Sequence, residues 1–183
     1  SVTGVQTCAL PILFDSPRLK LDVSVAASTP ARSKDNDARQ GMPNLAALGE
    51  IGPNLNYTVA GSVADRWRLD VRLPVRAAVT LERSPRFAGT TFSPHLNLDM
   101  GGVAGGWNLG LLTGPLFADR KYNERVYGVD PAYARPDRPA YQARGGYAGW
   151  QALAATSRRF GSTWVGGFVR YDSLRGAAFD DSP

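Results

Sequence analysis

The sequence predicts an all-β protein: an antiparallel, up-and-down transmembrane β-barrel, present as an incomplete fragment of about seven strands. Apolar and polar residues alternate along several long segments, and the connections between those segments are in turn short and long. No apolar run is long enough for a membrane-spanning helix. The chain has 20 glycines, 13 prolines and 10% aromatic residues, with only 20% charged residues. This composition disfavours a coiled coil and a disordered tail.

The first 13 residues are expected to be foreign to the protein. Residues 2–12 back-translate without a break onto a string that resembles a common short-read sequencing adapter, and they contain the single cysteine, Cys8. A lipidated cysteine would need a longer apolar stretch ahead of it. We therefore expect residues 14–183 to be a β-barrel fragment that is truncated at both ends and has lost its signal peptide.

The clearest alternation covers residues 67–82, where apolar residues take the odd positions and mostly polar residues the even ones. Sixteen residues in one register exceed the usual globular strand of about five or six. A barrel strand that crosses a bilayer needs about 9 to 11 residues. Pro53, Pro74 and Pro94 are awkward inside strands and are expected at bulges or rims. The other predicted strands cover residues 19–27, 51–59, 92–100, 107–111, 147–157 and 164–171.

The connections between the predicted strands alternate strictly in length. The short ones are residues 61–65, 101–105 and 160–163, and the long ones are residues 29–48, 83–89 and 118–146. A meander with short turns at one end and long loops at the other is typical of outer-membrane barrels, whose short turns are periplasmic. A soluble β-sandwich has no reason to sort its connections in this way.

Three of the four tryptophans occupy equivalent positions. Trp67, Trp107 and Trp164 each lie at the start of a strand that leaves a short turn. Aromatic residues are enriched where a barrel meets the membrane surface. We therefore predict that these three side chains form part of a periplasmic-side aromatic girdle, with packing in a soluble core as the alternative.

The polar residues of two strands are predicted to face the barrel lumen, where a polar interior is expected. They could line a channel or form an ion-pair network, because buried charges need partners. This predicted lumen-facing row consists of Arg68, Asp70, Arg72, Arg76, Glu82, His95, Asn97 and Asp99.

No catalytic, cofactor-binding or metal-binding residue is predicted. The single histidine, His95, shares a strand face with Ser93 and Asp99, which raises a hydrolase hypothesis. A row of side chains along one strand rarely lets a base contact both a nucleophile and an orienting group, so a solvated lumen histidine is preferred. The 21 basic and 16 acidic residues are interspersed, which disfavours a nucleic-acid partner.

Several sequence strings resemble the MipA/OmpV family of outer-membrane proteins. They occur in the family order over roughly residues 14–183. The strings are GMP (41–43), EIGPNL (50–55), DVRLPVR (70–76), FSPHLN (92–97), GPLFAD (114–119), YGVDPAY (127–133), RFG (159–161) and FVRYD (168–172).

The resemblance implies an outer-membrane β-barrel of a Gram-negative bacterium, in contact with outer-membrane lipid and without a cofactor or catalytic residue. The namesake of the family is similar to a scaffold that brings a lytic murein transglycosylase together with a murein synthase. The leading hypothesis is therefore a non-enzymatic scaffold for peptidoglycan-remodelling enzymes. Other members look like porins or adhesins, so a diffusion pore and an adhesin are the alternatives.

Overall fold

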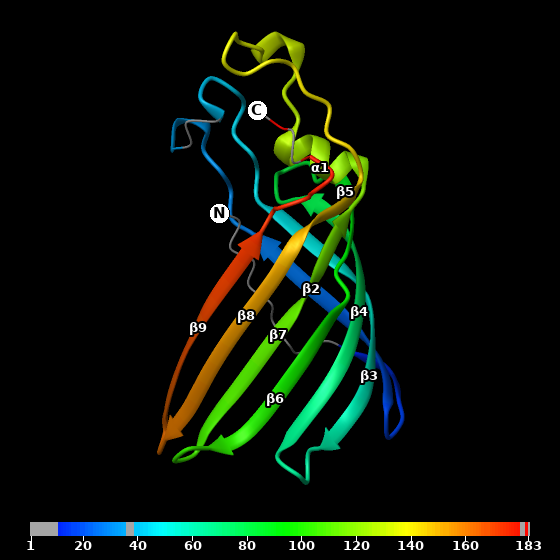
Figure 1. Ribbon diagram of the computed structural model, residues 1–183, viewed down its shortest axis with the longest axis vertical. Coiled ribbons are helices and arrows are strands. Elements are labelled where there is room, and N and C mark those ends of the chain that lie inside the picture. Colours follow the sequence, from blue (N-terminus) through cyan, green and yellow to red (C-terminus); the bar gives the residue numbers. More distant parts are fainter. Residues whose placement is uncertain (1–10, 36–38, 180–181, 183) are drawn as a thin grey trace.

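The strands form one antiparallel sheet that curls into a partial ring (Figure 1). The computed structural model describes residues 11–35, 39–179 and 182. No helix in these ranges is long and apolar enough to cross a membrane. The strands are β1 (Ile12–Asp15), β2 (Leu19–Ser28), β3 (Leu48–Ser62), β4 (Trp67–Thr80), β5 (Phe87–Phe92), β6 (His95–Val103), β7 (Trp107–Ala118), β8 (Gly146–Phe160) and β9 (Thr163–Ser173).

The sheet is an up-and-down meander in which strands that follow one another pair, except that β5 and β6 each pair with β4 and β7. The order is β1-β2-β3-β4-β5-β7-β8-β9, and β6 pairs with β4 and β7 below β5. β5 and β6 thus act as one strand that is interrupted at Ser93 and Pro94. The predicted antiparallel all-β fold is confirmed, and each of the seven predicted segments lies in or overlaps a strand.

In its described residues, the structure has two strands more than predicted, because the segment 92–100 is divided and because β1 was not predicted. Pro94 has no N–H for the ladder, and the predicted segment 92–100 is divided there. β5 also takes residues that were expected in the loop 83–89. The short β1 pairs with the start of β2 and includes Ile12 and Leu13, two of the residues expected to be foreign. The other residues of that segment, apart from residue 11, lie outside the described part of the chain.

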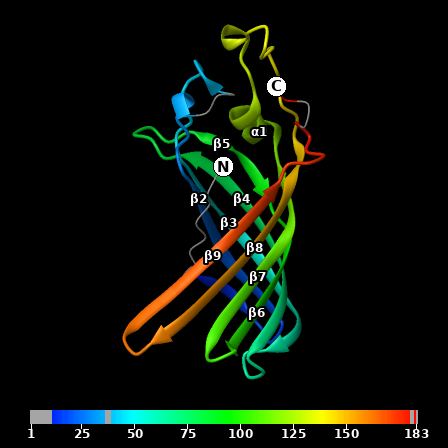
Figure 2. The same ribbon diagram turned by 60° about the vertical axis from the view of Figure 1, so that its left-hand side comes forward.

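The two ends of the ring differ in the way the sequence predicts. Tight turns join β3 to β4, β6 to β7 and β8 to β9, and we call this side the turn end. The opposite side, the loop end, carries the long connections together with η1 (Ser33–Asp35), α1 (Arg120–Tyr127) and η3 (Pro131–Tyr133). Figure 2, a view turned by 60°, again places α1 at the loop end.

Two glycines permit close approaches in the wall of the ring. A Cβ on Gly52 of β3 would overlap the carbonyl oxygen of Val75 in β4. A Cβ on Gly114 of β7 would overlap the carbonyl oxygen of Pro94. Gly114 therefore lets β7 lie against the interruption between β5 and β6, and a larger residue would force the backbones apart.

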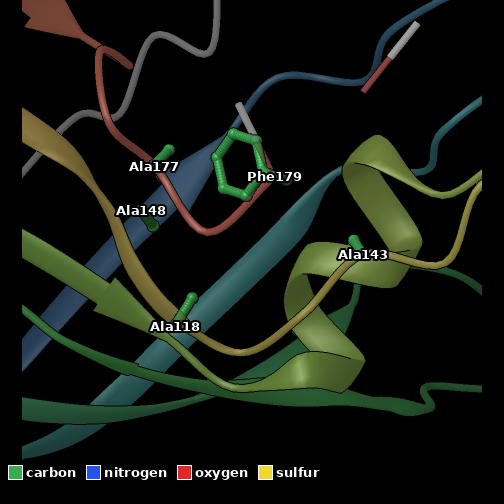
Figure 3. Packing of buried hydrophobic residues seen from close by; sticks show 5 residues of the cluster. All are labelled: Ala118, Ala143, Ala148, Ala177 and Phe179. Carbon is green, nitrogen blue, oxygen red and sulfur yellow. The ribbon is translucent and has the colours of Figure 1, made fainter. Parts of the chain in front are cut away.

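The apolar core is small and lies at the loop end. One cluster consists of Ala118, Ala143, Ala148, Ala177 and Phe179, which Figure 3 shows gathered beside α1. A second cluster consists of Leu48, Ala78 and Ala88. Tyr122 of α1 packs against both clusters, so this single side chain joins the helix to the wall of the ring.

Candidate functional site

The two faces of the sheet have opposite character except at β9, which is exposed on both faces. We call the face that carries Asp70, Arg76 and Asn97 the inner face and the face that carries Val75, Leu96 and Leu111 the outer face. A flat single-layer sheet would expose both faces, so the burial of one face shows that the sheet curls around it. The inner face buries Ser24, Asn54, Asn56, Asp70, Arg76, Thr80, Thr91, His95 and Asn97. The outer face exposes Ile51, Leu55, Tyr57, Trp67, Val75, Leu96, Leu111, Trp150, Val165, Val169 and Tyr171.

Asp70 is the centre of an ion-pair network on the inner face. Its side chain is 1% exposed and lies 3.0 Å from Arg68 Nε and 3.5 Å from Arg72 Nη2. The other carboxylate oxygen accepts a hydrogen bond of 2.9 Å from the Thr58 hydroxyl. Strand register brings these groups together, since Thr58 of β3 lies opposite Asp70 of β4. The arrangement neutralises a carboxylate that would be costly to bury alone.

A second carboxylate extends this network onto β6. Arg72 Nη2 also lies 3.5 Å from Asp99 Oδ2, which accepts a 2.7 Å hydrogen bond from Asn97 Nδ2. Arg72 therefore bridges two carboxylates on adjacent strands. Register places seven of the eight residues of the predicted row on the inner face. They are Arg68, Asp70, Arg72, Arg76, His95, Asn97 and Asp99.

Arg76 forms a separate network nearer the loop end. Its Nε donates to the Ser24 hydroxyl at 2.8 Å, and its Nη1 donates to the Ser93 hydroxyl at 3.3 Å. The same Nη1 lies 4.0 Å from Glu50 Oε2. Since Ser24 is on β2 and Arg76 on β4, this guanidinium reaches across β3 inside the ring.

His95 and Ser93 do not form a catalytic pair. The Nδ1–H of His95 donates to the backbone carbonyl of Ser93 at 2.7 Å, while the Ser93 hydroxyl accepts from Arg76. The histidine therefore does not contact the hydroxyl that it would have to activate. In the described residues, no group of three or more His, Cys, Asp or Glu is placed to hold a metal ion.

The remaining predicted site residues lie elsewhere. Glu82 is exposed beyond β4, which ends at Thr80, so it is not on the inner face. Trp67 and Trp107 are the first residues of β4 and β7, and both are on the outer face. Trp164 pairs with Arg159 in a register that puts it on the same face as Arg170 and Asp172. The girdle proposal therefore rests on Trp67 and Trp107.

α1 covers the inner face at the loop end. Its N-cap residue, Asp119, accepts hydrogen bonds of 2.8 Å from the backbone N–H groups of Tyr122 and Thr90. The helix is thereby fixed to β5 at its first turn. Glu124 accepts a 2.6 Å hydrogen bond from the backbone N–H of Ala143, which holds the returning loop against the same helix.

Tyr122 links α1 to the Arg76 network. Its hydroxyl donates to Glu50 Oε1 at 3.1 Å, and the other oxygen of Glu50 accepts from the Thr91 hydroxyl at 3.0 Å. Burial, reinforced by the nearby Glu50 carboxylate, raises the pKa of Tyr122 far above its usual value. The tyrosine is therefore neutral and acts as a hydrogen-bond donor.

Sequence reasoning missed this helix, which lies in a segment predicted only as a long loop. Two local signals were present: Asp119, a favoured N-cap residue, and Gly128, whose N–H bonds back to the carbonyl of Glu124. Eight residues give too short a pattern for a reliable helical period. The contact between Tyr122 and Glu50, 72 positions apart, has no local signal at all.

The curled antiparallel meander, with polar side chains inside and apolar side chains outside, defines the class of protein to which this chain belongs. The chain is a β-ring protein whose distribution of polarity is the reverse of that in a water-soluble barrel. The chain belongs to the MipA family: the family model of the MltA-interacting protein MipA matches residues 12–183. No curated protein and no solved structure matches it.

Proposed function

We propose that this protein is an outer-membrane β-barrel protein of a Gram-negative bacterium that acts as a non-enzymatic scaffold for peptidoglycan-remodelling enzymes. Its proposed partners are a lytic murein transglycosylase and a murein synthase. The observation that carries the proposal is the match of nearly the whole chain to a family named for interaction with the lytic transglycosylase MltA.

The distribution of polarity supports the membrane location. Large apolar side chains cover the outer face of β3 to β9, while charged and amide side chains of β3 to β6 are buried inside the ring. In water, such a surface would favour association with other apolar surfaces. In a bilayer, the same side chains contact lipid and the polar side chains remain shielded in the interior.

The turn end is the proposed contact surface for the enzymes. Short turns of outer-membrane barrels face the periplasm, where peptidoglycan is remodelled. The tip of the turn between β3 and β4 carries Val63, whose side chain is 80% exposed. This exposed side chain at the tip of the turn is free to contact a protein partner.

Retention of a purified lytic murein transglycosylase on the immobilised, detergent-solubilised chain tests the scaffold. We expect retention above that on an unrelated β-barrel protein, and we expect Val63→Asp at the turn end to reduce it. Tyr133→Asp at the loop end, where the side chain is also exposed, is the matched control and should have no effect. Equal retention on both barrels would contradict the proposal.

A diffusion pore is the second candidate, favoured by the three arginines that β4 presents to the inner face, Arg68, Arg72 and Arg76. All three arginines are paired with carboxylates, and α1 covers the inner face at the loop end. Both features favour a closed state of such a pore. Planar-bilayer recording distinguishes the candidates. Defined conductance that changes in Arg72→Gln would support the pore, and silence of the reconstituted protein would exclude it.

A further inference from the structure

Two arginines flank the turn between β6 and β7 at the turn end. Arg66 comes from the neighbouring turn between β3 and β4, and its carbonyl accepts a 2.6 Å hydrogen bond from the N–H of Gly101. Its Nη1 lies 2.9 Å from the point that a Cβ on Gly102 would occupy. Arg158 of β8 approaches from the other side, with Nη1 3.5 Å from the corresponding point on Gly105. Both guanidinium groups therefore lie against the same glycine-rich turn.

These two charges lack acidic partners. In the described ranges, neither Arg66 nor Arg158 makes an ion pair, whereas Arg68, Arg72, Arg76 and Arg170 each lie within 4.0 Å of a carboxylate. The carboxylate next to Arg66 in sequence, that of Asp65, accepts a 2.6 Å hydrogen bond from Ser62 instead. The turn end thus holds two arginines without an ion-pair partner among the described residues, while the arginines of the inner face are paired with carboxylates.

The backbone of Arg66 has an uncommon conformation. Its φ is +60°, a left-handed conformation that is uncommon for residues other than glycine, asparagine and aspartate. Glycine would adopt this conformation without cost. Ala104, in the turn between β6 and β7, also has a positive φ, of +35°, so both turns contain a residue other than glycine in this region.

Aromatic side chains of the outer face adjoin Arg158. Its guanidinium carbon lies 4.5 Å from the centroid of the Phe160 ring, which contacts Trp107 edge to face at 6.2 Å. Tryptophan beside arginine at the end of an apolar surface is typical of the zone where lipid headgroups meet a membrane protein. This aromatic border favours a lipid ligand over an acidic protein partner.

We propose that Arg66 and Arg158 each bind the phosphate of a phospholipid headgroup in the leaflet at the turn end. Guanidinium groups donate paired hydrogen bonds that match phosphate oxygens. Arg66 adjoins Gly102 at the end of β6 and Arg158 adjoins Gly105 in the turn that follows, so both basic groups lie at the same end of the sheet. The inference rests on the proposed membrane location and is independent of the scaffold role.

Native mass spectrometry of the detergent-solubilised chain with added lipid tests these sites. We expect phosphatidylglycerol to bind more tightly than phosphatidylcholine, because its negative charge is not offset by a choline group. Each of Arg66→Gln and Arg158→Gln should weaken phosphatidylglycerol binding about fivefold, and the double variant more, as expected for the loss of one and two basic groups near an anionic headgroup.

The matched control is the double variant of Arg83→Gln and Arg86→Gln, which removes the same charge from an exposed loop at the opposite end. The proposal is overturned if this control weakens binding as much, or if the turn-end double variant retains full binding. It is also overturned if inorganic phosphate alone competes as well as the lipid, which would indicate a site for a free anion. Retention of the transglycosylase is a separate measurement, so failure here leaves the scaffold proposal intact.

Discussion

Asp70 shows how much the inner face depends on single charges. The carboxylate is almost fully buried between Arg68, Arg72 and Thr58. Asp70→Ala leaves two arginines and a hydroxyl without this acceptor, and we expect a loss of about 3–5 kcal/mol in the free energy of unfolding. Urea unfolding of the detergent-solubilised protein measures it. Asp99→Ala is the control, with an expected cost below about 1 kcal/mol because that carboxylate is half exposed.

Tyr122 makes stability depend on alkaline pH. Its folded pKa lies above the unfolded value of about 10, so the folded state keeps a proton that the unfolded state loses. The contribution of Tyr122 to the free energy of unfolding is complete below pH about 10. Above that pH it declines by up to about 1.4 kcal/mol per pH unit. In urea unfolding over this range, Tyr122→Phe should flatten the decline. Tyr133→Phe, at an exposed tyrosine, should leave it unchanged, and an equal effect of both would refute this origin.

At the scale of elements, the strands and their meander order were predictable, and their exact ends and cross-strand contacts were not. Alternation predicted residues 67–82 as one strand, and β4 covers most of that range. The alternation of apolar and polar residues continues to Glu82, whereas the strand ends at Thr80. There the backbone N–H of Thr80 donates to the carbonyl of Arg86, and the Thr80 hydroxyl accepts from the N–H of Arg86. Periodicity reports which face a residue would take, but strand ends and cross-strand contacts depend on pairing that only the folded chain defines.

The attachment of α1 depends on its N-cap. Asp119 accepts from both Tyr122 N–H and Thr90 N–H, so Asp119→Ala removes one bond within the helix and one to β5. Loss of a cap costs about 0.5–2 kcal/mol, and we expect tryptic cleavage at Lys121 and Arg125 to accelerate up to about thirtyfold. Asp130→Ala, which uncaps η3 instead, is the control. Unchanged cleavage in Asp119→Ala would show that the packing of Tyr122 alone holds the helix.

At the scale of the whole molecule, the sequence predicted a polar and an apolar face of the sheet, because successive side chains of a strand point to opposite faces. The sequence did not predict that α1 and the long loops pack over the loop end. This packing needs Tyr122, Ala143 and Phe179 to meet from segments far apart in the chain, and only Tyr122 belongs to a helix. The sequence also placed Trp164 with the girdle from its position after a turn, although register puts this side chain on the other face from Trp107.

The outer face provides the sharpest test of the membrane location. Leu111 of β7 is 38% exposed there, opposite Leu98 of β6. On a water-soluble protein, an arginine at such an exposed site would change stability by at most about 0.5 kcal/mol. On a surface that contacts the bilayer core, we expect Leu111→Arg to cost about 2–4 kcal/mol and to reduce flotation of the protein with phospholipid vesicles. Val63→Arg, at the exposed tip of a turn, adds the same charge outside the bilayer and should float as the unchanged protein does. If both variants float equally well, the outer face does not contact lipid and the membrane location is wrong.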